Sequence, residues 1–400
     1  MNSKVRFVGL DVHKDTVVIA VAEEGAAPAE IFAEVPHEPA RLMARLKRLG
    51  TPESLRVCYE AGPTGYGLQR ILTQAGISCV VVAPSLVPTE SGRRVKTDRI
   101  DARRLAQFLR SGHLTAVWVP DEQTEALRDL ERARDDAKRA EKTVKHQLAK
   151  FLLRQGRRYS EGKQWTQRHW RWIEVQKFSH EAHRRVVVDS IQAVRQAAER
   201  VARLERDLGE LIEGWVLEPL VRNLQAFRGV AQLTAVGLAA EIGDFRRFPT
   251  AGKFMAFVGL VPSEYSSGGQ RRLGGITKTG NGHVRRLLIE AGWQYYHWPL
   301  RISLALHERR QGVPQPVIDI ADRAMHRLGR KAYKMRERGL SSKTIVTALA
   351  RELAGFLWAA ATCAVDSVPP GPRGRHRGPE VRRMPASPIG TESPSHVAAR

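Results

Sequence analysis

The first 117 residues contain strand-like and helix-like segments in an order that few folds accommodate. Runs rich in β-branched residues, which favour strands, occupy residues 5–10, 16–22, 30–35, 55–59 and 77–83. Apolar residues at helical spacing occupy residues 38–49, 66–75 and 98–110. The short link from His13 to Asp15 suits a hairpin between the first two strands. The pattern therefore predicts three strands, a helix, a strand, a helix, a strand and a final helix.

Four acidic residues stand where these predicted elements end or begin. Asp11 follows the first strand, Glu60 follows the fourth, and Asp98 and Asp101 open the last helix. Their spacing places Asp98 and Asp101 on one face of that helix. Basic residues flank the pair, so a cation held by carboxylates and approached by a phosphate would explain the composition. A helix dipole that favours acids at its N-terminus would also explain the pair.

The order of elements looks like the ribonuclease H fold in its RuvC-like variant, which is an α/β fold. The four acids fall at the positions where that fold gathers its carboxylates. A two-metal site needs several such groups, and Mg²⁺ prefers hard oxygen ligands of this kind. We therefore expect residues 1–117 to form an α/β RuvC-like catalytic domain that holds Mg²⁺ through Asp11, Glu60, Asp98 and Asp101.

The charge of the whole chain indicates a polyanionic partner. Lys and Arg number 65 against 42 Asp and Glu, which gives a formal net charge of +23, and nucleic acid is the simplest partner for such an excess. The three cysteines show no zinc-binding spacing, and no signal peptide opens the chain. The longest apolar run, residues 353–365, is too short to span a bilayer. These features predict a cytoplasmic protein with no membrane contact.

Residues 118–222 are rich in Ala, Arg, Glu and Lys and are expected to be helical. Helical patterns cover 125–153 and 187–215, and the second is a heptad repeat broken at Glu205. Two long helices joined by a loop predict an antiparallel coiled-coil arm that pairs protomers, although a helix pair within one chain gives the same pattern. Between them Trp165, Trp170 and Trp172 alternate with basic residues, and such residues either stack on unpaired bases or pack on neighbouring helices.

Residues 223–366 are expected to form a mainly helical domain around a glycine-rich segment. Residues 224–248 resemble a helix-hairpin-helix that contacts DNA phosphates, but Ala231 replaces the second glycine of the usual turn. The segment 259–283 contains Ser266 and Ser267, although a serine in such a loop is usually only a turn residue. Nearby cations suited to phosphates are Arg271, Arg272, Lys278, Arg285 and Arg286. Residues 367–400 are predicted to be a disordered basic tail.

Several short motifs, taken in order, resemble one family. They are Gly9-Leu10-Asp11, Tyr59-Glu60-Ala61, Lys96 to Ala102, Gly259 to Pro262, Ser267-Gly268-Gly269, Gly275 to Lys278 and Ala350 to Phe356. This set resembles the DEDD transposases of insertion sequences, which are relatives of the Piv DNA invertase and include bridge-RNA-guided recombinases. The resemblance covers about residues 5–365.

The resemblance implies a mechanism and a set of partners. The acidic quartet would bind Mg²⁺, and Ser267, the serine directly before glycine, would attack a DNA phosphodiester to form a transient phosphoserine link. The protein would work as a dimer or tetramer in which the acids of one protomer complete the serine site of another. A structured noncoding bridge RNA would pair with the donor and target DNA.

Two other functions are compatible with the same residues. A metal-dependent endonuclease of the Holliday-junction resolvase type would cut DNA with water and would not need Ser267. A catalytically silent nucleic-acid-binding protein would need neither the serine nor the acids, although the intact acidic set argues against it.

Overall fold

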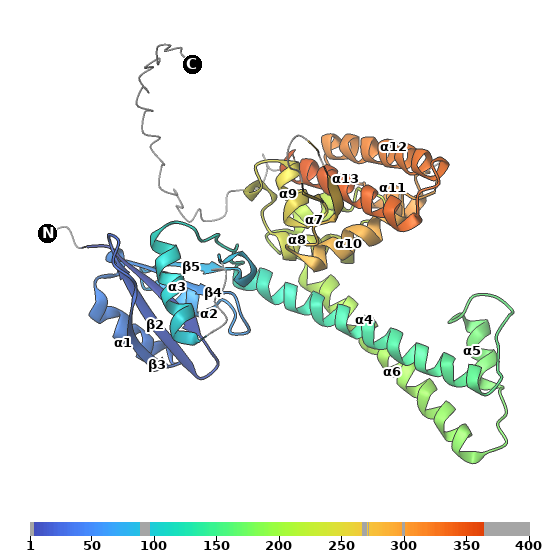
Figure 1. The fold of residues 1–400 in the computed structure, drawn as a ribbon. Coiled ribbons are helices and arrows are strands. Elements are labelled where there is room, and N and C mark those ends of the chain that lie inside the picture. The colour runs from blue at the N-terminus through green and yellow to red at the C-terminus, as the bar shows by residue number, and fades with distance from the viewer. Residues whose placement is uncertain (1–3, 89–96, 266–269, 271, 298–300, 364–400) are drawn as a thin grey trace, which may run out of the picture. The chain divides into compact units, whose positions relative to one another are not determined.

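The computed structural model describes residues 4–88, 97–265, 270, 272–297 and 301–363 of the 400 residues (Figure 1). Its chain falls into two compact units that divide after Leu130. The first unit is a mixed α/β layer structure and the second is almost entirely helical. Much of the long helix that begins at Glu122 clusters with the C-terminal helices. The domain boundaries at 117 and 222 expected from composition stay a prediction.

A five-stranded sheet organises the N-terminal unit. Its strands lie in the order β3-β2-β1-β4-β5, with β1 antiparallel to β2 and parallel to β4. Strand β3 is antiparallel to β2, and β5 is parallel to β4. The strands are β1 (Arg6–Val12), β2 (Thr16–Glu23), β3 (Glu30–Pro36), β4 (Leu55–Glu60) and β5 (Ser78–Val82). This mixed sheet fits the RuvC-like domain expected from the sequence.

Helices cover both faces of the sheet. On one face, α1 (Pro39–Leu49) and α2 (Gly67–Gln74) bury leucines against Leu10, Val57 and Tyr59. On the other face, α3 (Asp98–Arg110) packs Ala102 and Ala106 against β2. Two short 3₁₀ helices, Pro52–Ser54 and Pro84–Leu86, precede β4 and follow β5. Every predicted strand and helix of this unit is confirmed to within about two residues, the usual uncertainty of element ends.

Two long helices of the second region pack against each other within one chain. They are α4 (Glu122–Arg154) and α6 (Glu181–Leu211), and the short α5 (Gln167–Glu174) lies at the far end of the pair (Figure 1). The heptad residues Val187 and Val194 are buried in one cluster with Leu148 and Phe151 of α4. An ion pair of 2.6 Å between Arg134 and Glu205 also joins the helices, so the break in the heptad is a polar contact rather than a gap.

The three tryptophans between these helices contribute to the same packing. Trp165, Trp170 and Trp172 are partly buried against the apolar cluster of the helix pair. The ring of Trp172 stacks on His169, whose own side chain is buried. This outcome matches the second of the two roles expected for them, and their contact with unpaired bases stays a prediction.

The remaining helices surround a central apolar one. They are α7 (Glu218–Leu224), α8 (Gln232–Ile242), the 3₁₀ turn Phe245–Arg247, α9 (Ala251–Phe257), α10 (Gly282–Trp293), α11 (Leu304–Arg309), α12 (Gln315–Glu337) and α13 (Ser342–Cys363). Helix α13 packs against α9, α10 and α12. Among the helices described, it is the one whose length and hydropathy would allow it to cross a membrane. Its packing at the centre of the unit accounts for that composition.

The segment expected to form a helix-hairpin-helix consists of α7, a turn and α8. The turn is hydrogen-bonded to another part of the chain. Arg228 donates hydrogen bonds to the carbonyl oxygens of Gln294 at 2.7 Å and Arg301 at 2.9 Å. These bonds attach the turn to the chain that follows α10.

Candidate metal centre and serine segment

The ends of two parallel strands bring Asp11 and Glu60 to neighbouring positions. Leu10 of β1 is paired with Tyr59 of β4, so the residues that follow them in each strand lie side by side. Side chains alternate between the two faces of a strand. Because Leu10 and Tyr59 face the core beneath α1 and α2, Asp11 and Glu60 face the opposite side, which is covered by α3.

Gly9 allows α3 to approach this face closely. A Cβ atom at Gly9 would overlap the carbonyl oxygen of Ala102 and would lie 2.9 Å from Cβ of Leu105. Cys58, the next small residue on the same face, donates a hydrogen bond of 3.5 Å from its thiol to the carbonyl oxygen of Leu105. The small residues of the central strands therefore set the position of the helix that carries Asp98 and Asp101.

The first turn of α3 presents its two acids in a defined geometry. Thr97 precedes the helix, and its hydroxyl accepts a hydrogen bond of 3.3 Å from the backbone N–H of Ile100. This cap fixes where the helix begins. The carboxylate of Asp101 lies 3.6 Å from Arg104 one turn along the same helix, and its side chain is only 14% exposed. Asp98, at 58%, faces solvent.

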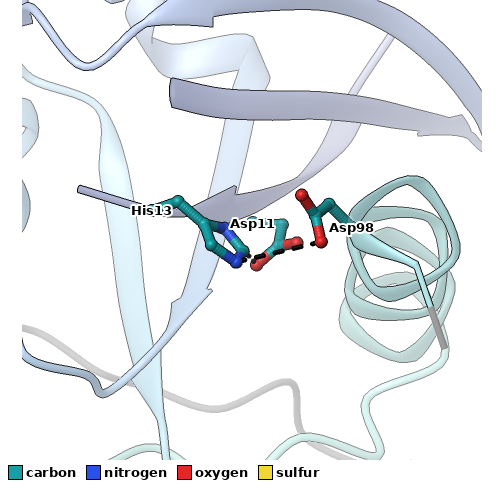
Figure 2. Close-up of side chains that lie close together, drawn as sticks. All are labelled: Asp11, His13 and Asp98. Carbon is teal, nitrogen blue, oxygen red and sulfur yellow. Dashed lines mark ion pairs between the residues drawn. The ribbon is translucent and has the colours of Figure 1, made fainter. Parts of the chain in front are cut away.

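Asp11, His13 and Asp98 converge at the end of β1 (Figure 2). His13 Nδ1 lies 3.5 Å from Asp11 Oδ1, and His13 Nε2 lies 3.8 Å from Asp98 Oδ1. One ligand atom from each of the three residues lies within 4.8 Å of the others. The group is therefore compact enough for its members to hold one metal ion.

The burial and the raised pKa of the Asp11 carboxyl are consistent with a cation beside it. Its Oδ2 atom is buried and has no hydrogen-bond partner among the described residues. Burial raises the pKa of Asp11 to about 6; His13 opposes this shift, and the nearby acids Asp98, Asp101 and Glu60 add to it. A buried carboxylate surrounded by other carboxylates is costly to ionise without a counter-charge. A divalent cation would supply that charge, so the residues fit a metal site.

His13 was not identified as a site residue from the sequence. Its position is fixed by the hairpin turn between β1 and β2, where its N–H donates to the carbonyl oxygen of Thr16 at 2.9 Å. Its own carbonyl oxygen lies 2.7 Å from Nδ1 of His37. A histidine two residues after a strand-end aspartate is the only sequence signal, and it is a weak one.

The glycine-rich segment contains two short strands that form a hairpin. Strands β6 (Pro262–Glu264) and β7 (Leu273–Ile276) pair antiparallel, and Ser266, Ser267 and Arg271 lie outside the described residues. At the base of the hairpin, Gly280 has φ of +67°, and a Cβ there would overlap the carbonyl oxygen of Phe257. Only glycine tolerates both conditions.

Four of the five cations predicted to bind phosphates lie within the described residues, and they differ in their contacts. The guanidinium of Arg285 donates to the carbonyl oxygens of Val258 and Thr279, both at 2.9 Å, and so closes the base of the glycine-rich segment. Arg286 pairs with Asp135 at 2.8 Å and Glu290 at 3.0 Å. Lys278 and Arg272 are exposed. Phosphate binding by these residues stays a prediction, with Arg285 and Arg286 already engaged inside the chain.

A buried polar network joins α10 to α4. His283 Nε2 lies 2.8 Å from Glu131 Oε2, whose side chain is only 2% exposed. One turn further along both helices, Arg286 meets Asp135. The Glu131 carboxylate, which can accept a hydrogen bond from the imidazole N–H, raises the pKa of His283 above its ordinary value, although burial opposes the shift. The two pairs hold α10, which directly follows the glycine-rich segment, against α4.

Comparison with known protein families identifies the class of protein. Residues 8–155 match the profile of the DEDD transposases of the IS110 type, described as Transposase. Residues 221–307 match the family described as Transposase IS116/IS110/IS902 family. The two matches cover the acidic centre and the glycine-rich segment respectively. The chain is therefore a transposase, an enzyme that cleaves and rejoins DNA.

Similarity to individual proteins extends over most of the chain. It is 42% identical over 357 residues to the putative transposase y4qE of Sinorhizobium fredii (strain NBRC 101917 / NGR234), covering 89% of this chain and 88% of the relative. It is 31% identical over 335 residues to the transposase for insertion sequence element IS1533 of Leptospira borgpetersenii, covering 83% and 96%. The chain belongs to the IS116/IS110/IS902 family of transposases.

Proposed function

We propose that this transposase cleaves and rejoins DNA through a serine–phosphate ester, with Ser267 as the nucleophile. The observation that carries the metal-assisted part of the proposal is the convergence of Asp11, His13 and Asp98, with a buried oxygen of Asp11 left without a hydrogen-bond partner. The choice of Ser267 as nucleophile is supported by the family resemblance of its motif. The proposed ligands of Mg²⁺ are the carboxylates of Asp11, Glu60, Asp98 and Asp101. Imidazole is not a ligand that Mg²⁺ favours, so His13 is proposed as a neighbour that orients the acids.

The acids and the serine divide the work of the reaction. When bound, the divalent ion would neutralise charge on the reacting phosphate. Ser267 Oγ forms a bond to phosphorus as its proton passes to a base, and the bond from phosphorus to one deoxyribose oxygen breaks. That oxygen leaves with a proton as a free hydroxyl. In rejoining, a DNA hydroxyl attacks the phosphoserine and restores Ser267 Oγ–H.

The bonds made and broken in this scheme are equivalent. Each step exchanges one phosphoester for another, so rejoining requires no external energy source. The 400 residues contain no Gly-rich loop of the kind that binds ATP phosphates, which supports the scheme. Hydrolysis by water, as in a junction endonuclease, would instead leave broken strands that need another enzyme to seal.

We further propose that the active assembly is a dimer or tetramer guided by a structured RNA. The net charge of +23 supports a nucleic-acid partner. In this assembly the acids of one protomer would serve Ser267 of another. The presence of an RNA is tested by recovering the nucleic acid that copurifies with the protein and asking whether its sequence lies next to the gene.

A covalent trap tests the nucleophile. The full chain, with the nucleic acid that copurifies with it, is incubated with Mg²⁺ and an element-end DNA nicked beside the cleavage site, so that the released strand escapes and the protein–DNA adduct accumulates. We expect the wild type and the Ser266→Ala variant to form an adduct, and the Ser267→Ala variant to form none. Cleaved DNA free of protein, with full activity of Ser267→Ala, would identify the junction endonuclease instead. An adduct lost only in Ser266→Ala would move the nucleophile by one residue.

A further inference from the structure

A row of basic side chains follows one face of α12. The row steps by four, three, four and four residues, which is the spacing of a single helix face. It comprises Arg323, Arg327, Arg330 and Lys334 of α12 and Arg338 at the C-cap of that helix. These residues, together with Lys331, line a groove of about 960 Å³ between α12 and α13. The groove lies beyond residue 307, outside both segments matched by the family profiles.

Acidic residues neutralise only part of this row. Glu352 of α13 pairs with Arg327 at 2.8 Å and with Lys331 at 2.6 Å, so one carboxylate serves two cations. Asp322, the other acid of the groove, pairs with Arg310 at 2.8 Å. Within the described part of the chain, Arg323, Arg330, Lys334 and Arg338 have no acidic partner.

The unpaired cations repel one another in the folded protein. Arg330 and Lys334 are four residues apart, as are Lys334 and Arg338, and like charges at this spacing destabilise a helix. A solvated basic face would normally intersperse acids along such a row, as α6 does where Glu181 meets both Arg184 and Arg185. The described residues of the groove offer no such relief, so an external polyanion is the counter-charge that fits.

The geometry favours a regular and extended polyanion. At a rise of about 1.5 Å per residue, the row from Arg323 to Arg338 extends for about 22 Å. Duplex DNA presents about one phosphate charge per 1.7 Å of its axis, so a straight helix can meet several phosphates of one stretch. Duplex DNA is also the substrate of this enzyme class.

We propose that the α12 face, defined as Arg323, Arg330, Lys334 and Arg338, is a binding surface for the phosphate backbone of duplex DNA. Contacts of this kind position a duplex without reading its sequence. The α12 face thus adds a second DNA contact that is separate from the acids and the serine. It depends on neither the nucleophile nor the metal.

The test measures binding of the full chain to a fluorescent duplex in EDTA, over a range of KCl concentrations. Four contacts contribute about 0.9 each to the slope of log affinity against log salt, so replacing the four residues of the α12 face with Gln should make that slope shallower by about 3 to 4. The change should be the same for two duplexes of unrelated sequence. Gln keeps good helix propensity, and far-UV circular dichroism checks that the variant is folded.

A matched variant separates a specific surface from general charge. Four exposed cations of α1, namely Arg41, Arg45, Lys47 and Arg48, are replaced with Gln to remove the same charge. This control should keep nearly the wild-type slope. An equal loss in both variants, or an unchanged slope in the α12 variant, overturns the proposal. Loss of binding to an RNA hairpin with duplex binding intact would also overturn it, because RNA would then occupy the face.

Discussion

Replacing Asp11 with Asn should stabilise the metal-free protein near neutral pH and abolish its stabilisation by divalent ions. The pKa of Asp11 rises from 3.8 to about 6 in the folded chain, mainly through burial. Two pKa units correspond to about 3 kcal/mol. The side chain retains 18% exposure, and solvent screening reduces the recoverable free energy to about 1–2 kcal/mol. Removing the carboxylate should therefore raise the free energy of unfolding by that amount.

The size of this gain in the free energy of unfolding depends on pH. The carboxyl of the unfolded chain ionises near pH 4, whereas the folded chain keeps its proton up to about pH 6. The stability that this proton contributes is complete below about pH 4 and is lost as the pH rises to about 6. The gain from Asp11→Asn should consequently be small near pH 4 and full above about pH 7.

Urea unfolding in EDTA, followed by circular dichroism across this pH range, measures the effect. Addition of Mg²⁺ should then stabilise the wild type and leave the variant unchanged, because only the wild type has the carboxylate that the ion needs. Glu24→Gln, at an exposed acid in the turn after β2, is the matched control and should change neither result. A variant no more stable than the wild type at neutral pH would refute the idea that this acidic cluster is strained without a cation.

Three further changes test the packing that supports the site. Gly9→Ala should cost at least about 1–3 kcal/mol by overpacking against α3 and should weaken Mg²⁺-dependent stabilisation in the same unfolding assay. His283→Ala should lower the free energy of unfolding by about 3 kcal/mol, because it leaves Glu131 buried without its partner. The wild type should lose stability as the pH rises above the ordinary pKa of histidine, and the variant should lack that pH dependence. Leu208→Ala, at a fully buried heptad position, should cost about 2–5 kcal/mol, whereas Leu211→Ala, 55% exposed, should change unfolding little. A change in oligomer mass from Leu208→Ala without loss of stability would instead place that residue between protomers.

The N-terminal sheet could be predicted from sequence because its signals are local. Val-rich runs such as Thr16–Glu23 end at Gly, Pro or charged residues, and the acids Asp11 and Glu60 stand directly after two of these runs. The parallel pairing of β1 with β4 then follows from the order of the elements. The helix that begins at Asp98 was predicted as well, from apolar residues at helical spacing over residues 98–110.

Other features depend on contacts that no local pattern shows. The ion pair between Glu131 and His283 joins residues far apart in the chain, and each alone resembles an ordinary surface residue. Strand β7 is four residues long and contains Gly274 and Gly275, so it has little strand propensity of its own. The division after Leu130 falls inside the single long helix α4, where the helical pattern continues without a break.

That uninterrupted helix determines how the protein can be dissected. The first turn of α4 is held by Arg70, which pairs with Glu125 at 2.5 Å, while Glu131 two turns later is held by His283. A fragment that starts or stops at residue 130 would sever the helix and leave Glu131 at a frayed end. Limited digestion or gene truncation should instead be aimed at the loop between Ser111 and Asp121, which leaves the C-cap of α3 at Ser111 and the Asp121–Thr124 cap of α4 intact.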